Sequence, residues 1–277
     1  MKLAVSSLAW TPEDDDRVAR VLEAHAIAGL ELVPTKRWRD LSSVPQEEIT
    51  GYRRYWNARG IEIVALQAVL FGREDLTLFG SQAKRDEGID YFASVFRMAR
   101  MLGARVIVYG SPRNRQGVDR HDPSVFAIAE QYFRRLGALA REHAVRLCIE
   151  PLPAQYPCDF ITTTAEALRF VDRVNEPGFG LHLDSASLYG GDEDVPCALA
   201  AARGRIGHVH LSEPGLAPVG PGGRVPLAAF LRLLMQQDYG NWASVEMREA
   251  ASTAANPDQV AVTLDYVCQA VSAASRL

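Results

Sequence analysis

The chain of 277 residues has a formal net charge of −4, and 48% of its residues are hydrophobic, as in an ordinary globular protein with a sizeable core. Because no run of Lys and Arg forms a basic stripe, neither nucleic acid nor a membrane is predicted as a partner. The four cysteines include no CxxC pair, and Cys148 lies in an apolar run, which predicts reduced thiols. The apolar stretch at the start is too short for a signal peptide or a membrane-spanning helix, so we expect a cytoplasmic protein.

Short β-rich runs alternate with longer segments of helical spacing along the whole chain. The runs cover residues 2–10, 30–33, 61–69, 104–110, 145–150, 179–184, 206–211 and 243–247. The helical segments cover residues 11–29, 44–60, 81–103, 122–143, 163–175, 195–204, 226–237 and 257–275. Such alternation requires parallel strands with right-handed helical crossovers, and eight repeats favour a closed (β/α)8 TIM barrel. We predict a single α/β barrel domain over residues 1–277, with an open doubly wound sheet as the alternative.

Local signals refine this prediction. The first helical segment has an N-cap at Thr11, a proline at Pro12 and Gly29 after its last residue. No GxGxxG motif follows the first strand and no GxxxxGK[ST] motif occurs, which argues against both common nucleotide-binding folds. The Gly-, Pro- and Arg-rich segments 111–122 and 212–225 fit loops over the catalytic mouth of a barrel.

Acidic and imidazole side chains end the last four predicted strands. They are Glu150, Asp184, His210 and Glu246. A charge at the end of a buried strand is costly unless it is paired, solvated or bound to a cation, and three converging carboxylates repel one another. A divalent ion removes that repulsion, and oxygen ligands with one imidazole suit Mn²⁺, Mg²⁺, Co²⁺ or Zn²⁺. The alternative is that each residue pairs separately with a loop arginine.

Period-two alternation places His208 and His210 on the same side of their strand. His210 is nearer the rim and is the predicted ligand. His208 and His182 lie one layer deeper, so we expect them to be hydrogen-bonded core residues or supports for the ligands. The remaining histidines, predicted to be solvated, are His25, His121 and His143.

Other residues near the strand ends are candidates for substrate contacts. Trp10 and Phe71 would either wall the pocket or pack in its rim. Arg113 would hold a carboxylate or phosphate bidentately, or would be a solvated loop residue. The other candidates are Gln67, Arg248 and Glu31. The alternative for Glu31 is a simple ion pair with Lys36 or Arg37.

The sequence resembles the sugar phosphate isomerase/epimerase family with a xylose-isomerase-like TIM barrel. The likeness covers nearly the whole chain and rests on IEPLPAQYPCDF (149–160), HLDSAS (182–187), HVHLSEPGLAPVGPGG (208–223) and SVEMR (244–248), with weaker support from GLELVP (29–34) and GSPRNR (110–115). The resemblance implies that Glu150, Asp184, His210 and Glu246 bind one divalent metal ion, and that Glu150 and Glu246 also exchange the substrate proton. We therefore expect a metal-dependent enzyme of carbohydrate metabolism, with manganese among its metals. It would isomerise or epimerise a small sugar, inosose or keto-acid derivative through an enediolate.

Two positions depart from the ketose 3-epimerases of that family. Ser187 stands where they have a histidine three residues after the aspartate, and Leu216 stands where they have an arginine six residues after the metal histidine. Both of those residues normally touch substrate hydroxyls, so Ser187 is a candidate substrate contact. We expect common unphosphorylated ketohexoses to be poor substrates, and any anionic group to be held on the opposite side by Arg113 or Arg115.

Other functions remain open at this point. A dehydratase is the nearest alternative, because the same enediolate can expel a β-hydroxyl group. The chemistry of endonuclease IV needs several metals, many histidines and a basic groove, whereas this chain has six histidines, most of them away from strand ends. The barrel could also be a non-catalytic subunit of a complex. The sequence leaves the oligomeric state open, a homo-oligomer included.

Overall fold

Eight parallel strands close into a barrel in the computed structural model, which describes residues 1–119, 122–191 and 193–276. Each strand pairs with its neighbours in the sequence, and β8 pairs with β1, so the sheet has no open edge. The predicted (β/α)8 barrel is therefore confirmed. The strands are β1 (Lys2–Ser6), β2 (Gly29–Leu32), β3 (Glu62–Leu66), β4 (Val106–Tyr109), β5 (Arg146–Ile149), β6 (Phe179–Asp184), β7 (Ile206–Ser212) and β8 (Trp242–Glu246).

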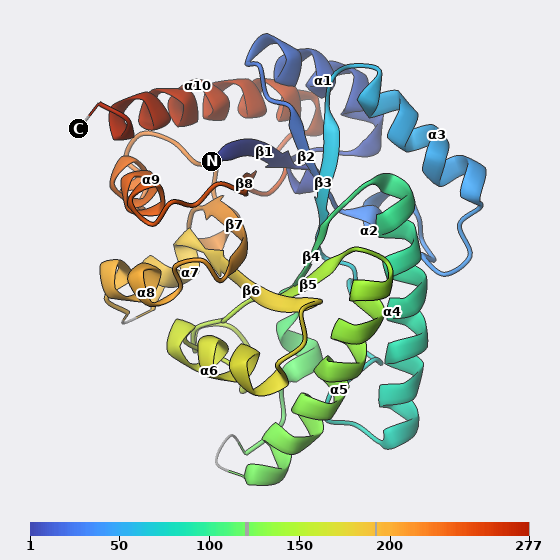
Figure 1. Ribbon diagram of the computed structural model, residues 1–277. Helices are drawn as coiled ribbons and strands as arrows, with labels where there is room; N and C mark the ends of the chain where they lie inside the picture. Colours follow the sequence, from blue (N-terminus) through green and yellow to red (C-terminus); the bar gives the residue numbers. More distant parts are fainter. Residues whose placement is uncertain (120–121, 192, 277) are drawn as a thin grey trace.

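The long helices surround the barrel (Figure 1). Several of them begin where a side chain accepts a hydrogen bond from a backbone N–H of the first turn, as Ser81, Asp122 and Thr163 do. The helices are α1 (Asp15–Ala24), α2 (Pro34–Arg37), α3 (Gln46–Asn57), α4 (Gln82–Leu102), α5 (Pro123–Glu142), α6 (Thr164–Val174), α7 (Ser185–Gly190), α8 (Val195–Ala201), α9 (Leu227–Gln236) and α10 (Asn256–Ala274). Short 3₁₀ turns cover Ser7–Ala9, Pro12–Asp14, Pro112–Arg115, Pro214–Leu216 and Thr253–Ala255.

The first helix differs from its prediction at both ends. Pro12–Asp14 form a 3₁₀ turn, and α1 begins only at Asp15. Thr11 has the extended backbone of an N-cap, but its side chain makes no capping hydrogen bond. At the other end, Ala26 adopts a left-handed conformation with φ of 52°, so the chain leaves the helix well before Gly29, which begins β2.

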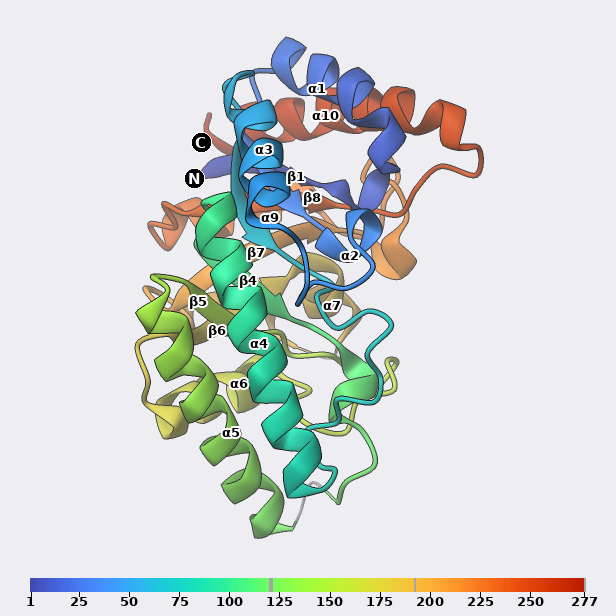
Figure 2. The same ribbon diagram turned by 90° about the vertical axis from the view of Figure 1, so that its right-hand side faces the viewer.

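One end of the barrel is built for a functional site. The short helices α2 and α7 and the loops after β3 and β4 gather there, at the carboxyl ends of the strands (Figure 2). Active sites of this fold lie at that end. Strands β6 and β7 are buried along their whole length, so polar residues near their ends have little water to face. The strand register shifts between Leu30 and Glu31 and between Leu181 and His182, and such irregularities redirect the following side chains.

Aromatic side chains pack between strand β6 and helices α5 and α6. The ring of Phe133 on α5 lies 4.9 Å from that of Phe179 on β6 and 5.6 Å from that of Phe170 on α6, measured between centroids.

In the part of the chain that the structure describes, no helix combines the length and the apolar character needed to cross a membrane. All four cysteines are free thiols, and Cys148 and Cys158 are buried.

Candidate active site

The predicted metal ligands come together at the carboxyl ends of β5 to β8. Glu150 directly follows β5, Asp184 ends β6, His210 lies in β7 and Glu246 ends β8. Asp184, His210 and Glu246 are buried, and one potential ligand atom from each lies within 4.8 Å of the others. The Nδ1 atom of His210 is 3.3 Å from Oε2 of Glu246 and 4.0 Å from Oδ2 of Asp184. These three residues, called the ligand trio below, therefore surround one point.

Glu150 approaches the ligand trio from the side of β4. Its carboxylate lies so close to Gly110 that a Cβ atom at that position would overlap Oε2 of Glu150. Burial, reinforced by the charges of Asp184 and Glu246, raises the pKa of Glu150 to about 8. This carboxyl group therefore holds a proton at neutral pH.

The same crowding changes the pKa values of two members of the ligand trio. Burial and the neighbouring charge of Glu246 raise the pKa of Asp184. Burial by itself would lower the pKa of His210, but the carboxylates of Glu31 and Glu246 outweigh it and hold that pKa well above its ordinary value. All three pKa values are raised, as expected where buried carboxylates lie close together, because a proton on any of these groups reduces the repulsion between them. Added positive charge would therefore stabilise the cluster. A divalent cation would supply it, and the mixed oxygen and imidazole donor set fits such an ion.

Hydrogen bonds hold Asp184 in place. Its Oδ1 accepts from the backbone N–H of Ser187 at 2.6 Å, which makes Asp184 the N-cap of α7, and its Oδ2 accepts a short bond from Oγ of Ser212. Ser185 holds Ser212 in turn, since its Oγ donates to the carbonyl of Ser212 at 2.9 Å and accepts from its N–H at 2.8 Å. Outer contacts of this kind orient metal ligands. Neither serine was predicted from the sequence, although Ser185 directly follows Asp184 and Ser212 lies two residues after His210.

A cavity of about 430 Å³ opens beside Glu150 and Glu246. Most of its wall is apolar, and Phe71 lines it although 77% of the surface of this residue is exposed. Arg113 lies at the rim, where its Nη1 is 3.5 Å from Oε1 of Glu74. The apolar lining residues are Leu8, Leu70, Phe71, Val108, Pro112 and Leu216. The two glutamates thus share one cavity of a size that suits a small molecule.

The sequence profile of the xylose isomerase-like TIM barrels matches residues 19–268. The chain belongs to this family. Its resemblance to that family, inferred from the segments around the four strand ends, is thereby confirmed.

Two curated relatives of this xylose isomerase-like barrel carry the same name, L-ribulose 3-epimerase. The one from Methylomonas sp. (strain DH-1) is 31% identical over 106 residues, which are 38% of this chain and 36% of the relative. The one from Mesorhizobium japonicum is 25% identical over 189 residues, 66% of this chain and 61% of the relative. The matched segments therefore span less than two thirds of either relative.

Solved structures share the fold over the whole chain. A structure of L-ribulose 3-epimerase has a TM-score of 0.83 and 18% identity, and the match covers 100% of this chain and 96% of that one. A structure of IOLI protein with a zinc atom has a TM-score of 0.78 and 18% identity, and the match covers 100% of both chains. At these identities the likeness shows the barrel fold alone.

The residues predicted to contact a substrate are divided between the cavity and the core of this xylose isomerase-like barrel. Gln67, Phe71 and Arg113 line the cavity. Trp10 does not face it: its indole ring is buried, and Nε1 donates a hydrogen bond to Oδ1 of Asp15 at 2.9 Å. Trp10 therefore packs behind the rim, because its polar atom already has a partner on α1.

The remaining candidates support the walls of the mouth. Ser187 is buried and contributes its backbone N–H to the cap of α7. Arg248 is exposed, and its backbone N–H donates to the carbonyl of Leu216 at 2.9 Å, which ties the loop after β8 to the rim. Arg115, expected to hold an anion, is instead fully buried and donates from Nη2 to the carbonyl of Glu150 at 2.9 Å. Its guanidinium group thus satisfies backbone carbonyls beneath the mouth.

The histidines outside the barrel interior differ from their prediction. His25 is half-buried, and its Nε2 lies 3.2 Å from Oδ1 of Asp265 on α10. His143 is also half-buried, and burial lowers its pKa. Both rings are therefore partly shielded from solvent, which the sequence pattern of single helices does not reveal. His121 lies outside the described residues.

Proposed function

We propose that this chain is a divalent-metal-dependent isomerase or epimerase of carbohydrate metabolism that acts on a small sugar, inosose or keto-acid derivative. The observation that carries the proposal is that Glu150 and Glu246 line one cavity, beside the ligand trio. The two relatives named L-ribulose 3-epimerase support a ketose as the substrate class.

The proposed metal ligands are Glu150, Asp184, His210 and Glu246. The ion would be Mn²⁺, Mg²⁺, Co²⁺ or Zn²⁺, because three carboxylates and one imidazole suit ions of this kind. When bound, a divalent ion draws electron density from a substrate carbonyl and so eases removal of the proton on the adjacent carbon. The zinc atom of the similar solved structure supports a divalent ion in this barrel.

The two glutamates would divide the proton transfer. One carboxylate removes the proton next to the carbonyl, and the other carboxyl group returns a proton. Both carboxyl groups line the same cavity, so each can reach a small molecule held there. Return to the same carbon from the opposite face gives an epimer, whereas return to the former carbonyl carbon gives an isomer.

The proposal is tested by incubating the metal-loaded protein in D₂O with a panel of ketopentoses, ketohexoses, inososes and keto acids. We expect an epimer that carries one deuterium at the carbon that lost its proton, or an isomer that carries one deuterium at the former carbonyl carbon. A product that has lost water would instead identify the dehydratase alternative. If the protein binds metal but converts no member of the panel, the non-catalytic alternative gains and the proposal fails.

Gly110→Ala tests the placement of Glu150. The added Cβ would overlap the Glu150 carboxylate and push it away from the ligand trio. Because a misplacement of about 1 Å can cost roughly a hundredfold in rate, we expect a loss of turnover approaching that size. Gly220→Ala is the matched control, since a Cβ there would meet nothing within 4 Å. Steady-state kinetics and thermal melting of both variants decide, and equal turnover of the two would contradict this placement.

Leu216→Arg tests the substrate preference of the mouth. Leu216 lines the cavity with an apolar side chain, so substrate hydroxyl groups near it find no donor there. An arginine would supply a charged donor, and a gain of about 1.5 kcal/mol corresponds to roughly a tenfold lower KM for ketohexoses. Leu216→Met keeps the volume without a donor and should leave KM unchanged. We leave Ser187 intact in this test, because it is buried and a histidine would not fit without moving its neighbours. Strong ketohexose turnover by the unmodified protein would show that Leu216 does not limit the substrate range.

We also propose that the protein works in the cytoplasm and on a small molecule rather than on nucleic acid or a membrane. Four free thiols support a reducing compartment. The net charge of −4 gives no attraction to polyanions.

A further inference from the structure

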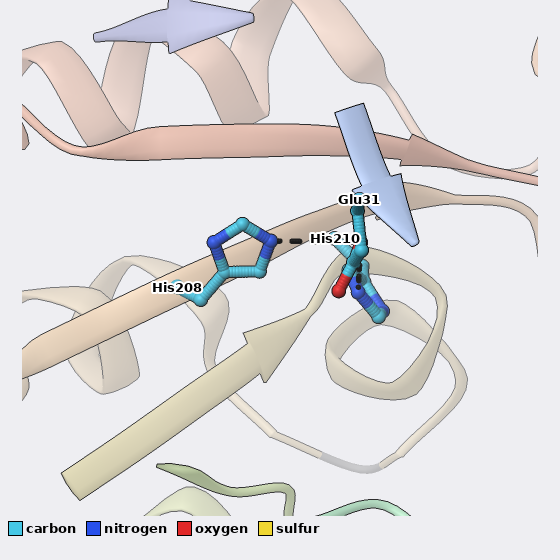
Figure 3. Close-up of side chains that lie close together, drawn as sticks. All are labelled: Glu31, His208 and His210. Atoms are coloured by element: carbon cyan, nitrogen blue, oxygen red, sulfur yellow. Dashed lines mark hydrogen bonds and ion pairs between the residues drawn. The ribbon is translucent and has the colours of Figure 1, made fainter. Parts of the chain in front are cut away.

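Glu31 is a fully buried carboxylate at the carboxyl end of β2. Its side chain points into the barrel toward β7 (Figure 3). Its Oε2 atom is 2.9 Å from Nε2 of His210 and 3.6 Å from Nε2 of His208. Among the described residues, the imidazoles of His208 and His210 are the basic groups within 4.0 Å of this carboxylate. Glu31 therefore depends on the histidines of β7 for its partners.

The two ring nitrogens of His210 face different surroundings. Nε2 faces Glu31, whereas Nδ1 faces Glu246 at 3.3 Å and Asp184 at 4.0 Å. An ionised carboxylate only accepts hydrogen bonds, so its contact with His210 keeps a proton on Nε2. A neutral imidazole with its proton on Nε2 has its lone pair on Nδ1. That lone pair then points to the place where the carboxylates of the ligand trio converge.

We propose that Glu31 is a positioning residue that fixes the tautomer and the ring orientation of His210 for metal binding. The inference rests on the proposed function, because it assumes that the ligand trio binds a metal ion. Its negative charge would also strengthen Nδ1 as a donor through the shared ring. Glu31 is not among the described residues that line the cavity beside Glu150 and Glu246, so in this proposal it acts through His210 and not by the direct substrate contact predicted from the sequence.

The deeper layer of the barrel holds this arrangement together. The Nε2 atom of His208 lies 2.8 Å from Oγ of Ser244 on β8, which fixes His208 beneath Glu31. His182 packs its ring edge-on against His210, with centroids 4.1 Å apart. The ring of His210 is thus held by an aromatic neighbour at its side and by the Glu31 carboxylate at Nε2. His208 is hydrogen-bonded in the core, one of the two roles predicted for it, whereas neither ring nitrogen of His182 has a hydrogen-bond partner among the described residues.

The test measures metal affinity directly, by competition between the purified protein and a chromophoric chelator for Zn²⁺ and for Mn²⁺. Loss of a carboxylate that supports a metal-bound histidine typically weakens affinity on the order of ten- to a hundredfold. We expect a loss near the lower end for Glu31→Gln, which keeps an acceptor, and near the upper end for Glu31→Leu.

Glu213→Gln is the matched control. Glu213 is also a buried glutamate near the mouth, but its carboxylate accepts from the backbone N–H groups of Arg224 and Val225. Its replacement should leave metal affinity unchanged. Wild-type affinity in Glu31→Leu would overturn the inference about Glu31 alone, whereas a wild-type protein that binds neither ion would overturn the proposed function.

A measurement on the unmodified protein keeps the inference testable if the Glu31 variants do not fold. In the Zn²⁺-loaded protein, ¹⁵N NMR of the His210 ring should show a protonated Nε2 and a metal-bound Nδ1. The reverse assignment, with the metal on Nε2, would overturn the role of Glu31.

Discussion

Replacing Asp184 by asparagine should weaken metal binding by at least about a hundredfold. This effect is larger than that expected when a residue that only supports a metal ligand is lost. The substitution removes one carboxylate charge from the ligand trio. The fold should survive, because asparagine caps a helix about as well as aspartate and can still accept from the N–H of Ser187. Calorimetric titration with Mn²⁺ and Zn²⁺ measures the affinity, and circular dichroism checks the fold.

The thermal stability of the wild type and of Asp184→Asn, with and without a chelator, gives a second measure of metal binding. A ligand present at about a hundredfold excess over its Kd stabilises the folded state by about 2.7 kcal/mol. For a domain of this size that corresponds to a rise in Tm of roughly 5–10 °C. We expect this rise in the wild type, its reversal by a chelator, and almost none in Asp184→Asn. Unchanged melting of the wild type after chelation would contradict a bound metal.

The pH dependence of the chelated protein follows from the direction of the pKa shifts. Burial raises the pKa of Glu150 from its ordinary 4.5 to about 8 and also raises that of Asp184. A raised pKa means that the folded state binds the proton more tightly, so the folded state loses stability as the pH rises from about 4.5 to about 8. Asp184→Asn removes a charge that helps to raise the pKa of Glu150, so its Tm should fall less than that of the chelated wild type as the pH rises from about 4.5 to about 8. A constant difference would show that Asp184 is not crowded by its neighbours.

The parts of the site that the sequence predicted are those governed by strand periodicity. Asp184 and Glu246 end parallel strands and His210 lies near the end of the strand between them, so closure of the barrel brings their side chains together. Period-two alternation likewise placed His208 on the same face as His210. None of these inferences needed a side-chain conformation.

The remaining features depend on contacts between distant segments. Glu31 and His210 are 179 residues apart, and no local pattern indicates that the two would form a hydrogen bond across the barrel. Arg115 and Trp10 lie in segments after strands, where an exposed position is the ordinary expectation. Both turn inward because backbone carbonyls satisfy Arg115 and the Asp15 carboxylate satisfies Trp10.

The largest effect on catalysis is expected from the two glutamates that line the cavity. Glu150→Gln and Glu246→Gln should each reduce turnover by at least about a hundredfold, the usual contribution of a positioned acid or base. Glutamine keeps the size of the side chain but neither gives nor takes a proton, so both folds should survive. Glu213→Gln is the control, because that glutamate accepts from backbone N–H groups in the loop after β7.

Metal affinity separates the roles of the two glutamates. Glu246 belongs to the ligand trio, with Oε2 at 3.3 Å from Nδ1 of His210, so its variant should lose metal affinity as well as turnover. Glu150 lies against Gly110 at the edge of the cluster, so its variant should lose turnover at saturating metal with a much smaller loss of affinity. Turnover measured together with metal content distinguishes these outcomes. If Glu150→Gln keeps near-native turnover once it is metal-loaded, the acid/base pair proposed here is wrong, and a proton donor other than Glu150 must face the substrate.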